Sequence, residues 1–157
     1  RSMRFEDIWP RGTASEIGSY HFTAEKIVEF ASKFDPQYFH LDAERAKESV
    51  LGGLCASGWH VCSAWMGLNV GYMFGEFKRM AKDGHQPPKL GPALGFRDLR
   101  WRLPVFAGDT VTYSNTLTRT VKAPNHADRL LHDVTCEGRN QDGKIVVSFA
   151  PTVIEFI

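Results

Sequence analysis

Two residues with acid–base side chains, Asp35 and His40, lie five positions apart in the segment from Phe34 to Leu41. A carboxylate and an imidazole at this spacing can be placed around one small substrate or water molecule. Histidine takes up a proton near neutral pH, and a carboxyl sheltered by aromatic neighbours can have its pKa raised enough to hold or deliver one. Such a pair could add or remove water across a double bond. The alternative is structural, with Asp35 capping a turn and His40 packed or at the surface.

Two adjacent glycines, Gly52 and Gly53, precede the longest apolar stretch of the chain. Free backbone N–H groups at the start of a helix can stabilise negative charge on a carbonyl oxygen, such as that of a thioester enolate. Glycines here would equally permit a tight turn and close packing of the helix against a sheet. The two interpretations are compatible, and both place the start of a helix at this point.

Other reactive side chains fit structural roles better. Cys55 and Cys62 are seven residues apart in the apolar stretch, where cysteine usually packs as a small hydrophobic side chain. His60 falls in the same pattern and is expected to be a hydrogen-bonded core or pocket residue. No carboxylates and histidines have metal-ligand spacing, so we predict no metal site.

The elements that position the candidates follow from the apolar pattern. Residues 17–22 favour a strand, and Thr23 can cap a helix that carries apolar residues on one face, namely Ile27, Phe30, Ala31 and Phe34. Pro36 disfavours a continuing helix, so residues 35–40 are predicted to form a loop, followed by a weak helical patch at 43–49.

A long, well-buried helix is predicted after Gly53, with apolar residues at roughly helical intervals: Leu54, Cys55, Trp59, Cys62, Met66, Val70, Met73, Phe74 and Phe77. Four β-rich stretches follow, at 94–105, 110–121, 130–139 and 144–156, separated by turn-forming residues. This order predicts an α+β domain in which an antiparallel sheet covers one long apolar helix.

Composition limits the remaining possibilities. The 157 residues, 43% of them hydrophobic, suit one compact domain. The 19 basic and 18 acidic residues are spread along the chain, which argues against nucleic acid or an anionic membrane surface as the partner. The apolar stretch is too polar to span a membrane, and three cysteines without CxxC spacing favour a cytoplasmic protein. Arg1 and Ser2 resemble a residual cloning sequence before Met3, so we expect the domain to span 3–157.

Three blocks of the sequence, in order, resemble the MaoC-like dehydratase family, which includes (R)-specific enoyl-CoA hydratases. They are FDPQYFHLD at 34–42, GGLCASG at 52–58 and PVFAGDT at 104–110. Asp35 and His40 fall in register with the family's Asp-x-Asn-Pro-x-His motif. The chain departs from the pattern at three positions: Gln37 stands for Asn, Tyr38 for Pro, and Gly52 for a common His.

The resemblance implies a hotdog fold and reversible hydration of a trans-2-enoyl-CoA to a 3-hydroxyacyl-CoA, a reaction that requires no metal and no redox cofactor. It implies that His40 activates water, that Asp35 orients the water and exchanges a proton with the substrate carbon, and that the Gly53 amide polarises the thioester carbonyl. Gly52 and Tyr38 are the further candidates for substrate binding, although Tyr38 could instead pack beneath the loop.

Two competing functions remain open. A hotdog acyl-CoA thioesterase would use the same acyl tunnel, but it commonly places an acidic group on the long helix, where only Glu76 is available. A non-catalytic subunit that binds acyl-CoA is the other alternative. Because a lone sheet layer leaves edges and apolar surface to be covered, we also expect a homodimer or a dimer of dimers.

Overall fold

The computed structural model describes residues 2–157 as a mixed α+β fold. The elements in chain order are α1 (Phe5–Ile8), β1 (Ser15–His21), α2 (Ala24–Phe34), α3 (Tyr38–Leu41), α4 (Ala43–Lys47), α5 (Gly58–Lys82), β2 (Lys89–Trp101), β3 (Thr110–Lys122), β4 (Arg129–Arg139) and β5 (Ile145–Phe156). All four predicted C-terminal strands are present. Three agree with the prediction to within one residue at each end, whereas the first spans 89–101 in place of 94–105.

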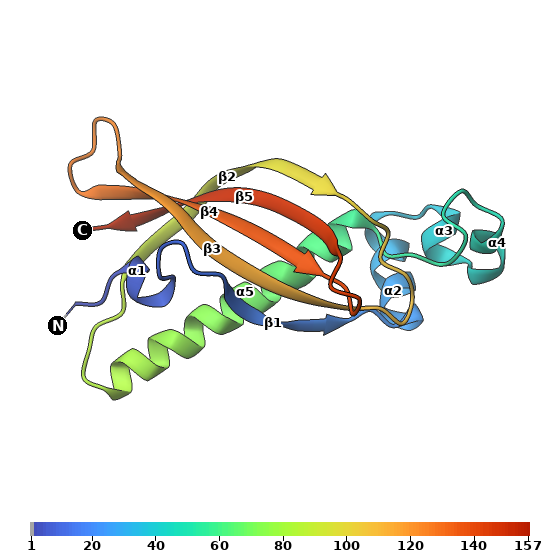
Figure 1. Ribbon diagram of the computed structural model, residues 1–157, viewed down its shortest axis with the longest axis horizontal. Coiled ribbons are helices and arrows are strands. Elements are labelled where there is room, and N and C mark those ends of the chain that lie inside the picture. Colours follow the sequence, from blue (N-terminus) through green and yellow to red (C-terminus); the bar gives the residue numbers. More distant parts are fainter. Residues whose placement is uncertain (1) are drawn as a thin grey trace.

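The five strands form one antiparallel sheet in the order β1-β3-β4-β5-β2, so β1 and β2 are its edges. Helix α5 runs along one face of this sheet, and the sheet curves around it (Figure 1). This is the hotdog arrangement that the resemblance implied. Among residues 2–157, no helix is long and apolar enough to cross a membrane.

The core lies between α5 and the concave face of the sheet. Alternate residues of β3 point inward, as the period of two in a strand requires, and Val111, Tyr113 and Leu117 are fully buried. The Tyr113 hydroxyl donates to the Val61 carbonyl of α5 at 2.7 Å. This bond fixes the N-terminal half of the helix against the sheet.

The predicted start of the long helix was wrong. Gly52 and Gly53 lie in an irregular segment, and α5 begins at Gly58 with Ser57 as its N-cap residue. Backbone bonds hold the intervening residues in an extended course, because the Ala56 N–H donates to Val105 and Ala107 donates to Leu54. Extended residues tied to a neighbouring loop cannot join the helix, so it starts six residues after Gly52.

The apolar face assigned to this helix was only partly correct. The buried residues of α5 are His60, Val61, Ala64, Trp65 and Met80. Trp59, Met66 and Phe74, which were expected to be well buried, are about half exposed. Trp59 and Met66 lie beside the packed face, where they line a small cavity with residues of β2 and β5.

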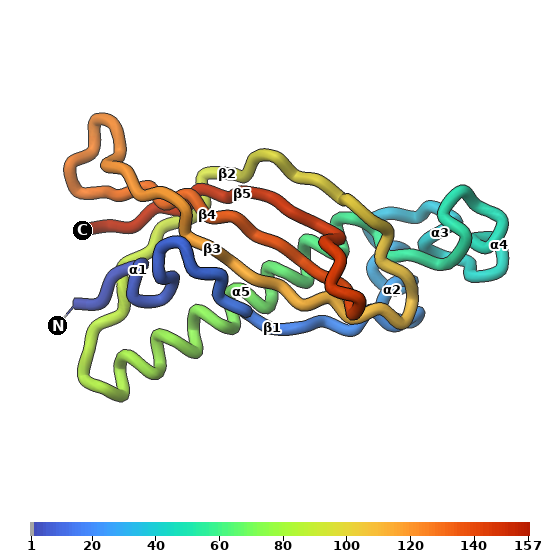
Figure 2. The backbone as a smooth tube through the Cα atoms, in the orientation of Figure 1, coloured from blue at the N-terminus to red at the C-terminus, as the bar shows by residue number. Residues whose placement is uncertain are grey.

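The segment that carries Asp35 and His40 projects from the end of the sheet as α2, α3 and α4 (Figure 2). The predicted cap of α2 is confirmed, since the Thr23 hydroxyl accepts from the Lys26 N–H. Phe34, expected on the buried face, is 70% exposed. The loop predicted at 35–40 is correct only up to Gln37. Helix α3 begins at Tyr38, two residues after Pro36, and carries His40.

Candidate active site

The structure brings Asp35 and His40 together near the N-terminal end of α5. Asp35 is the C-cap residue of α2 and His40 lies one residue before the end of α3. The His40 Nε2 atom is 3.3 Å from the Asp35 Oδ2 atom. His40 is buried, while Asp35 is partly exposed.

A backbone carbonyl determines which nitrogen of His40 carries hydrogen in the neutral ring. The Nδ1 atom lies 2.6 Å from the Cys55 carbonyl oxygen, which can only accept. Nδ1 must therefore be protonated, and the lone pair of Nε2 faces the Asp35 carboxylate. Two acceptors at this distance repel unless a proton lies between them or a water molecule donates to both, so the pair is arranged to hold a water molecule or a proton.

Asp35 does not have the raised pKa that its aromatic neighbours suggested. Burial, the largest single effect, opposes ionisation, but it is outweighed by the Gln37 amide, the nearby Ser57 hydroxyl and the adjacent His40 ring, and the pKa is lowered. The Gln37 amide donates to Asp35 Oδ1 at 2.7 Å. Asp35 is therefore ionised at neutral pH.

The start of α5 supplies two further groups that sequence reasoning missed. Ser57 is completely buried and its hydroxyl faces the Asp35 carboxylate, favouring the ionised form, although it meets no partner within hydrogen-bonding geometry. Gly58 is the first residue of the helix, so its N–H has no acceptor within the helix. Gly58 and His40 line the same cavity of about 260 Å³. The Ala-Ser-Gly sequence after Cys55 was the signal for this position, since Ser is a common N-cap.

Only glycine fits at position 58. A Cβ atom there would lie 2.4 Å from the Trp101 ring, which lies against the residue. The Trp101 indole also donates to the Gly58 carbonyl at 3.0 Å. Trp101 therefore forms part of the wall of this cavity and holds the first turn of α5 in place.

The three residues proposed to bind substrate do not gather around His40. Gly52 and Gly53 precede α5, and neither lines the cavity that contains His40. Gly53 faces the Phe106 ring, and Gly52 needs its positive φ of 78° for the turn. Tyr38 packs against Arg45, whose guanidinium lies 4.7 Å from the ring centre. Their roles in binding stay predictions without a supporting contact.

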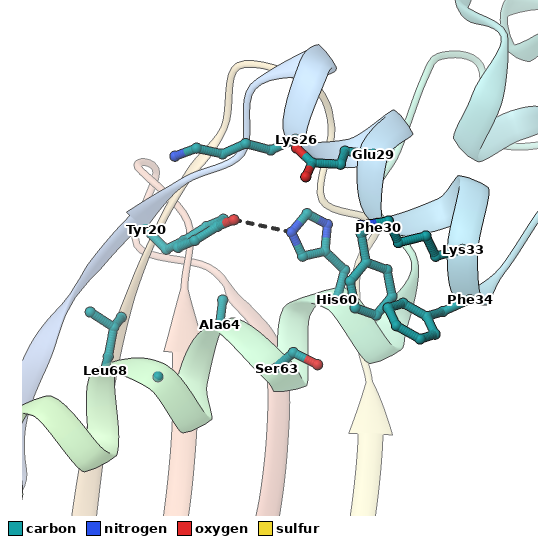
Figure 3. Close-up of a pocket in the computed structure, with 11 residues that line it drawn as sticks. Tyr20, Lys26, Glu29, Phe30, Lys33, Phe34, His60, Ser63, Ala64 and Leu68 are labelled. Atoms are coloured by element: carbon teal, nitrogen blue, oxygen red, sulfur yellow. Dashed lines mark hydrogen bonds between the residues drawn. The ribbon is translucent and has the colours of Figure 1, made fainter.

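A separate cavity of about 510 Å³ lies between β1, α2 and α5 (Figure 3). His60 lies in its wall, stacked on Phe30 at 4.7 Å, with Nε2 3.2 Å from the Tyr20 hydroxyl. Burial and the nearby Lys26 lower the pKa of His60 to about 4, so the ring is neutral. This agrees with the hydrogen-bonded pocket histidine expected from the sequence. Within residues 2–157, no cluster of three or more potential ligands could hold a metal ion.

A curved antiparallel sheet around a long helix, with an Asp–His pair at the helix start, defines a hotdog-fold protein with a candidate acid–base site. The family model described as MaoC like domain matches residues 11–127, and the chain belongs to this family.

Solved structures agree with this assignment. The MaoC-like dehydratase from Rhodospirillum rubrum is 28% identical, with a TM-score of 0.79 over 99% of this chain and 97% of that one. The monoamine oxidase regulatory protein from Archaeoglobus, 22% identical, has a TM-score of 0.81 over 99% and 95%. The (R)-hydratase from A. caviae involved in PHA biosynthesis, 23% identical, has a TM-score of 0.65 over 94% and 96%. The last two likenesses concern the fold alone.

The uncharacterized protein YdeM of Bacillus subtilis is 38% identical over 47 residues. This stretch is 30% of the present chain and spans only a third of the length of YdeM.

Proposed function

We propose that this protein is a hydratase or dehydratase of acyl thioesters that catalyses reversible hydration of a trans-2-enoyl-CoA to a 3-hydroxyacyl-CoA. The observation that carries the proposal is the Asp35–His40 pair, in which the Cys55 carbonyl keeps the Nε2 lone pair of His40 facing Asp35. Membership of the MaoC-like family and the hydratase among its structural relatives support the same reaction class.

In this reaction a water molecule lies beside the Asp35–His40 pair and donates to both side chains, since the 3.3 Å between Nε2 and Oδ2 is too short for it to lie between them. The Nε2 atom takes one proton from the water as its oxygen bonds to C3 of the enoyl group, and the C2=C3 π electrons move toward the thioester carbonyl. The proton then passes to C2, and the carbonyl is restored. Ionised Asp35 orients the water and stabilises the imidazolium, which differs from the direct proton exchange that the resemblance implied.

The negative charge on the thioester oxygen needs a hydrogen-bond donor, and we assign this role to the Gly58 N–H in place of Gly53. Gly58 begins a 25-residue helix and lines the same cavity as His40, whereas Gly53 does neither. A free N–H at a helix start can stabilise a developing oxyanion in a site from which water is excluded.

The test is the loss of enoyl absorbance with crotonyl-CoA and longer enoyl-CoA substrates, with a thiol reagent in a parallel reaction. We expect turnover without thiol release, and a loss of about 100-fold or more in Asp35→Asn and His40→Ala. Thiol release would instead indicate a thioesterase. Tight binding of acyl-CoA without turnover at any chain length would indicate the non-catalytic subunit.

Specific contacts bear on both alternatives. Glu76, the acidic group available to a thioesterase, is paired with Arg79 and lies 18 residues after Gly58, about 27 Å along α5. This distance disfavours the thioesterase. The bond from Gln37 occupies one oxygen of Asp35, and this is the observation that keeps the binding subunit in consideration.

We further propose a homodimer formed through the edge strand β2 and the adjoining side of α5. Large apolar side chains are exposed along both elements: Trp59, Met66, Phe74, Leu94, Phe96 and Trp101. A second copy would cover this surface and the unpaired edge. Light scattering after size-exclusion chromatography should give twice the chain mass at micromolar concentration, and Phe96→Glu should give the monomer. A parent protein that is monomeric would contradict this.

We also propose a cytoplasmic location, which the cysteine pattern predicted.

A further inference from the structure

Three cavities follow one another along one side of α5, and the first of them is lined by His40. The first, about 260 Å³, contains His40 and Gly58, and the second, about 110 Å³, begins beyond the Trp59–Trp101 pair. The third, about 180 Å³, shares Trp65 and Met66 with the second. Residues 58, 62, 66, 69 and 73 of the helix border these cavities, at the spacing of one helix face. An acyl chain whose thioester lies at Gly58 can extend along this face.

The third cavity is mostly apolar but contains a hydrogen-bonded chain formed by the Trp65 indole, the buried Asn115 amide and the half-buried Asn69 amide. Trp65 Nε1 donates to Asn115 Oδ1 at 2.8 Å, and Asn115 Nδ2 donates to Asn69 Oδ1 at 2.8 Å. The indole N–H can only donate, so it fixes the orientation of both amides in turn. Asn115 must present its oxygen to Trp65 and its nitrogen to Asn69.

The fixed orientation leaves the Nδ2 group of Asn69 as a free donor. Within residues 2–157 no acceptor is hydrogen-bonded to it, and it is not among the fully buried unpartnered atoms. Asn69 lines the third cavity, so a bound molecule can reach this N–H. An apolar acyl chain lying there would remove the group from water without an acceptor, which costs about 1–3 kcal/mol.

The chemistry of the cavity limits the acceptor to an uncharged oxygen. None of the residues that line it carries a charge, and its other walls include Phe5, Trp9, Val70 and Met73. A carboxylate would lose its hydration without a compensating cation, whereas a hydroxyl or ketone oxygen needs one donor only.

We propose that the acyl group of the substrate carries a hydroxyl or ketone oxygen far from the thioester, and that Asn69 selects for it. The inference rests on the proposed hydratase function and refines its substrate class. Gly58 and Asn69 are 11 residues apart on α5, about 16 Å, which an extended chain spans with about a dozen bonds. The oxygen should therefore lie about that many bonds from the thioester carbon.

The test compares enoyl-CoA substrates of 14 carbons that are plain, 12-hydroxylated or 12-oxo, with crotonyl-CoA as a short substrate that does not reach Asn69. The parent protein should favour the oxygenated chains over the plain chain by about three- to tenfold in kcat/KM. Asn69→Leu should bring this ratio to one or below. Because the substitution also leaves the buried Asn115 amide without its acceptor, the rate with each long substrate is divided by the crotonyl-CoA rate of the same variant. A ratio near one in the parent protein, or a ratio that Asn69→Leu does not alter, would overturn the inference.

A second variant separates selectivity from misfolding. Asn69→Asp keeps the shape and the bond from Asn115, but its ionised form has only acceptors. At pH 8 it should lose the preference for the ketone and keep that for the hydroxyl, which can donate; an unchanged ketone preference would contradict the role of Asn69. Calorimetric dissociation constants of the saturated acyl-CoA analogues test the same preferences without turnover. Inactivity with all enoyl substrates would thus count against the hydratase alone.

Discussion

Within residues 2–157, two histidine–carboxylate pairs have a buried histidine, and they differ in how completely their hydrogen bonds are made. His132 lies 2.9 Å from Glu155 through Nε2 and 2.8 Å from the Thr120 hydroxyl through Nδ1. Phe5 stacks on its ring at 4.2 Å, and both members of the pair are almost completely buried. In the Asp35–His40 pair the contact is longer, at 3.3 Å, and His40 lines a cavity.

Glu155 is bonded from three sides. It accepts from His132, from the Arg4 guanidinium at 3.0 Å and from the Phe5 N–H at 3.1 Å. This network ties α1 to β4 and β5 and leaves no position for a substrate atom. The comparison teaches that the same residue types serve stability where every group has a partner and serve chemistry where one lone pair stays accessible.

The largest expected contrast comes from matched histidine variants. His40→Gln should lower hydratase kcat/KM by about 100-fold or more with little change in melting temperature, because it removes the base. His132→Gln should lower the free energy of unfolding by about 3 kcal/mol, since it breaks a buried pair, and retain activity per folded molecule. The loss of enoyl absorbance measures hydratase activity, and thermal melting measures the stability of each variant. Equal effects of both variants on activity would remove the distinction.

The second contrast concerns acid stability. Burial opposes ionisation of Glu155, but its bonds from His132, Arg4 and Phe5 outweigh this and lower its pKa to about 2 from an ordinary 4.5. A lowered carboxyl pKa stabilises the fold above the unfolded value and loses that contribution as the pH falls from 4.5 toward 2. Glu155→Gln should be less stable than the parent by about 3 kcal/mol at pH 7.

Denaturant unfolding measured from pH 7 to pH 2 tests this. The difference between parent and Glu155→Gln should shrink below pH 4.5. A difference that stays constant over this range would assign the effect to shape and not to charge.

A smaller effect is expected at the wall of the active cavity. Gly58→Ala places a methyl group 2.4 Å from the Trp101 ring, which must move. We expect a loss of about tenfold in kcat/KM, because the first turn of α5 and its N–H shift relative to His40. Gly67→Ala, where a Cβ atom meets nothing within 4 Å, is the matched control and should be near the parent.

The smallest effect is a shift in the pH–rate profile. Gln37→Leu removes a donor that holds the pKa of Asp35 down. The pKa should rise, so the acidic limb of kcat/KM should move to higher pH by a fraction of a unit. The same substitution frees one oxygen of Asp35, and a profile that does not move would show that Gln37 does not control this carboxyl.

Local pattern was sufficient for much of the fold. The β-rich composition and the turn-forming residues between the stretches located the C-terminal strands, and Thr23 was recognised as a cap from its type and position. The Asp35–His40 pair could be proposed because its members are only five residues apart. The start of α5 was misplaced, because glycines suggested a boundary that the tertiary bonds of residues 54–57 moved to Gly58.

The sequence by itself determined which residues could do acid–base chemistry and the order of elements that carries them. Only the tertiary structure decided that Cys55 directs the His40 lone pair, that Gln37 keeps Asp35 ionised, and that Trp65 leaves a free donor on Asn69. The physical reason is that protonation and amide orientation depend on partners that folding brings within 3 Å of one another. His132 and Glu155 show the same limit, because they are 23 residues apart and nothing in their local sequence joins them.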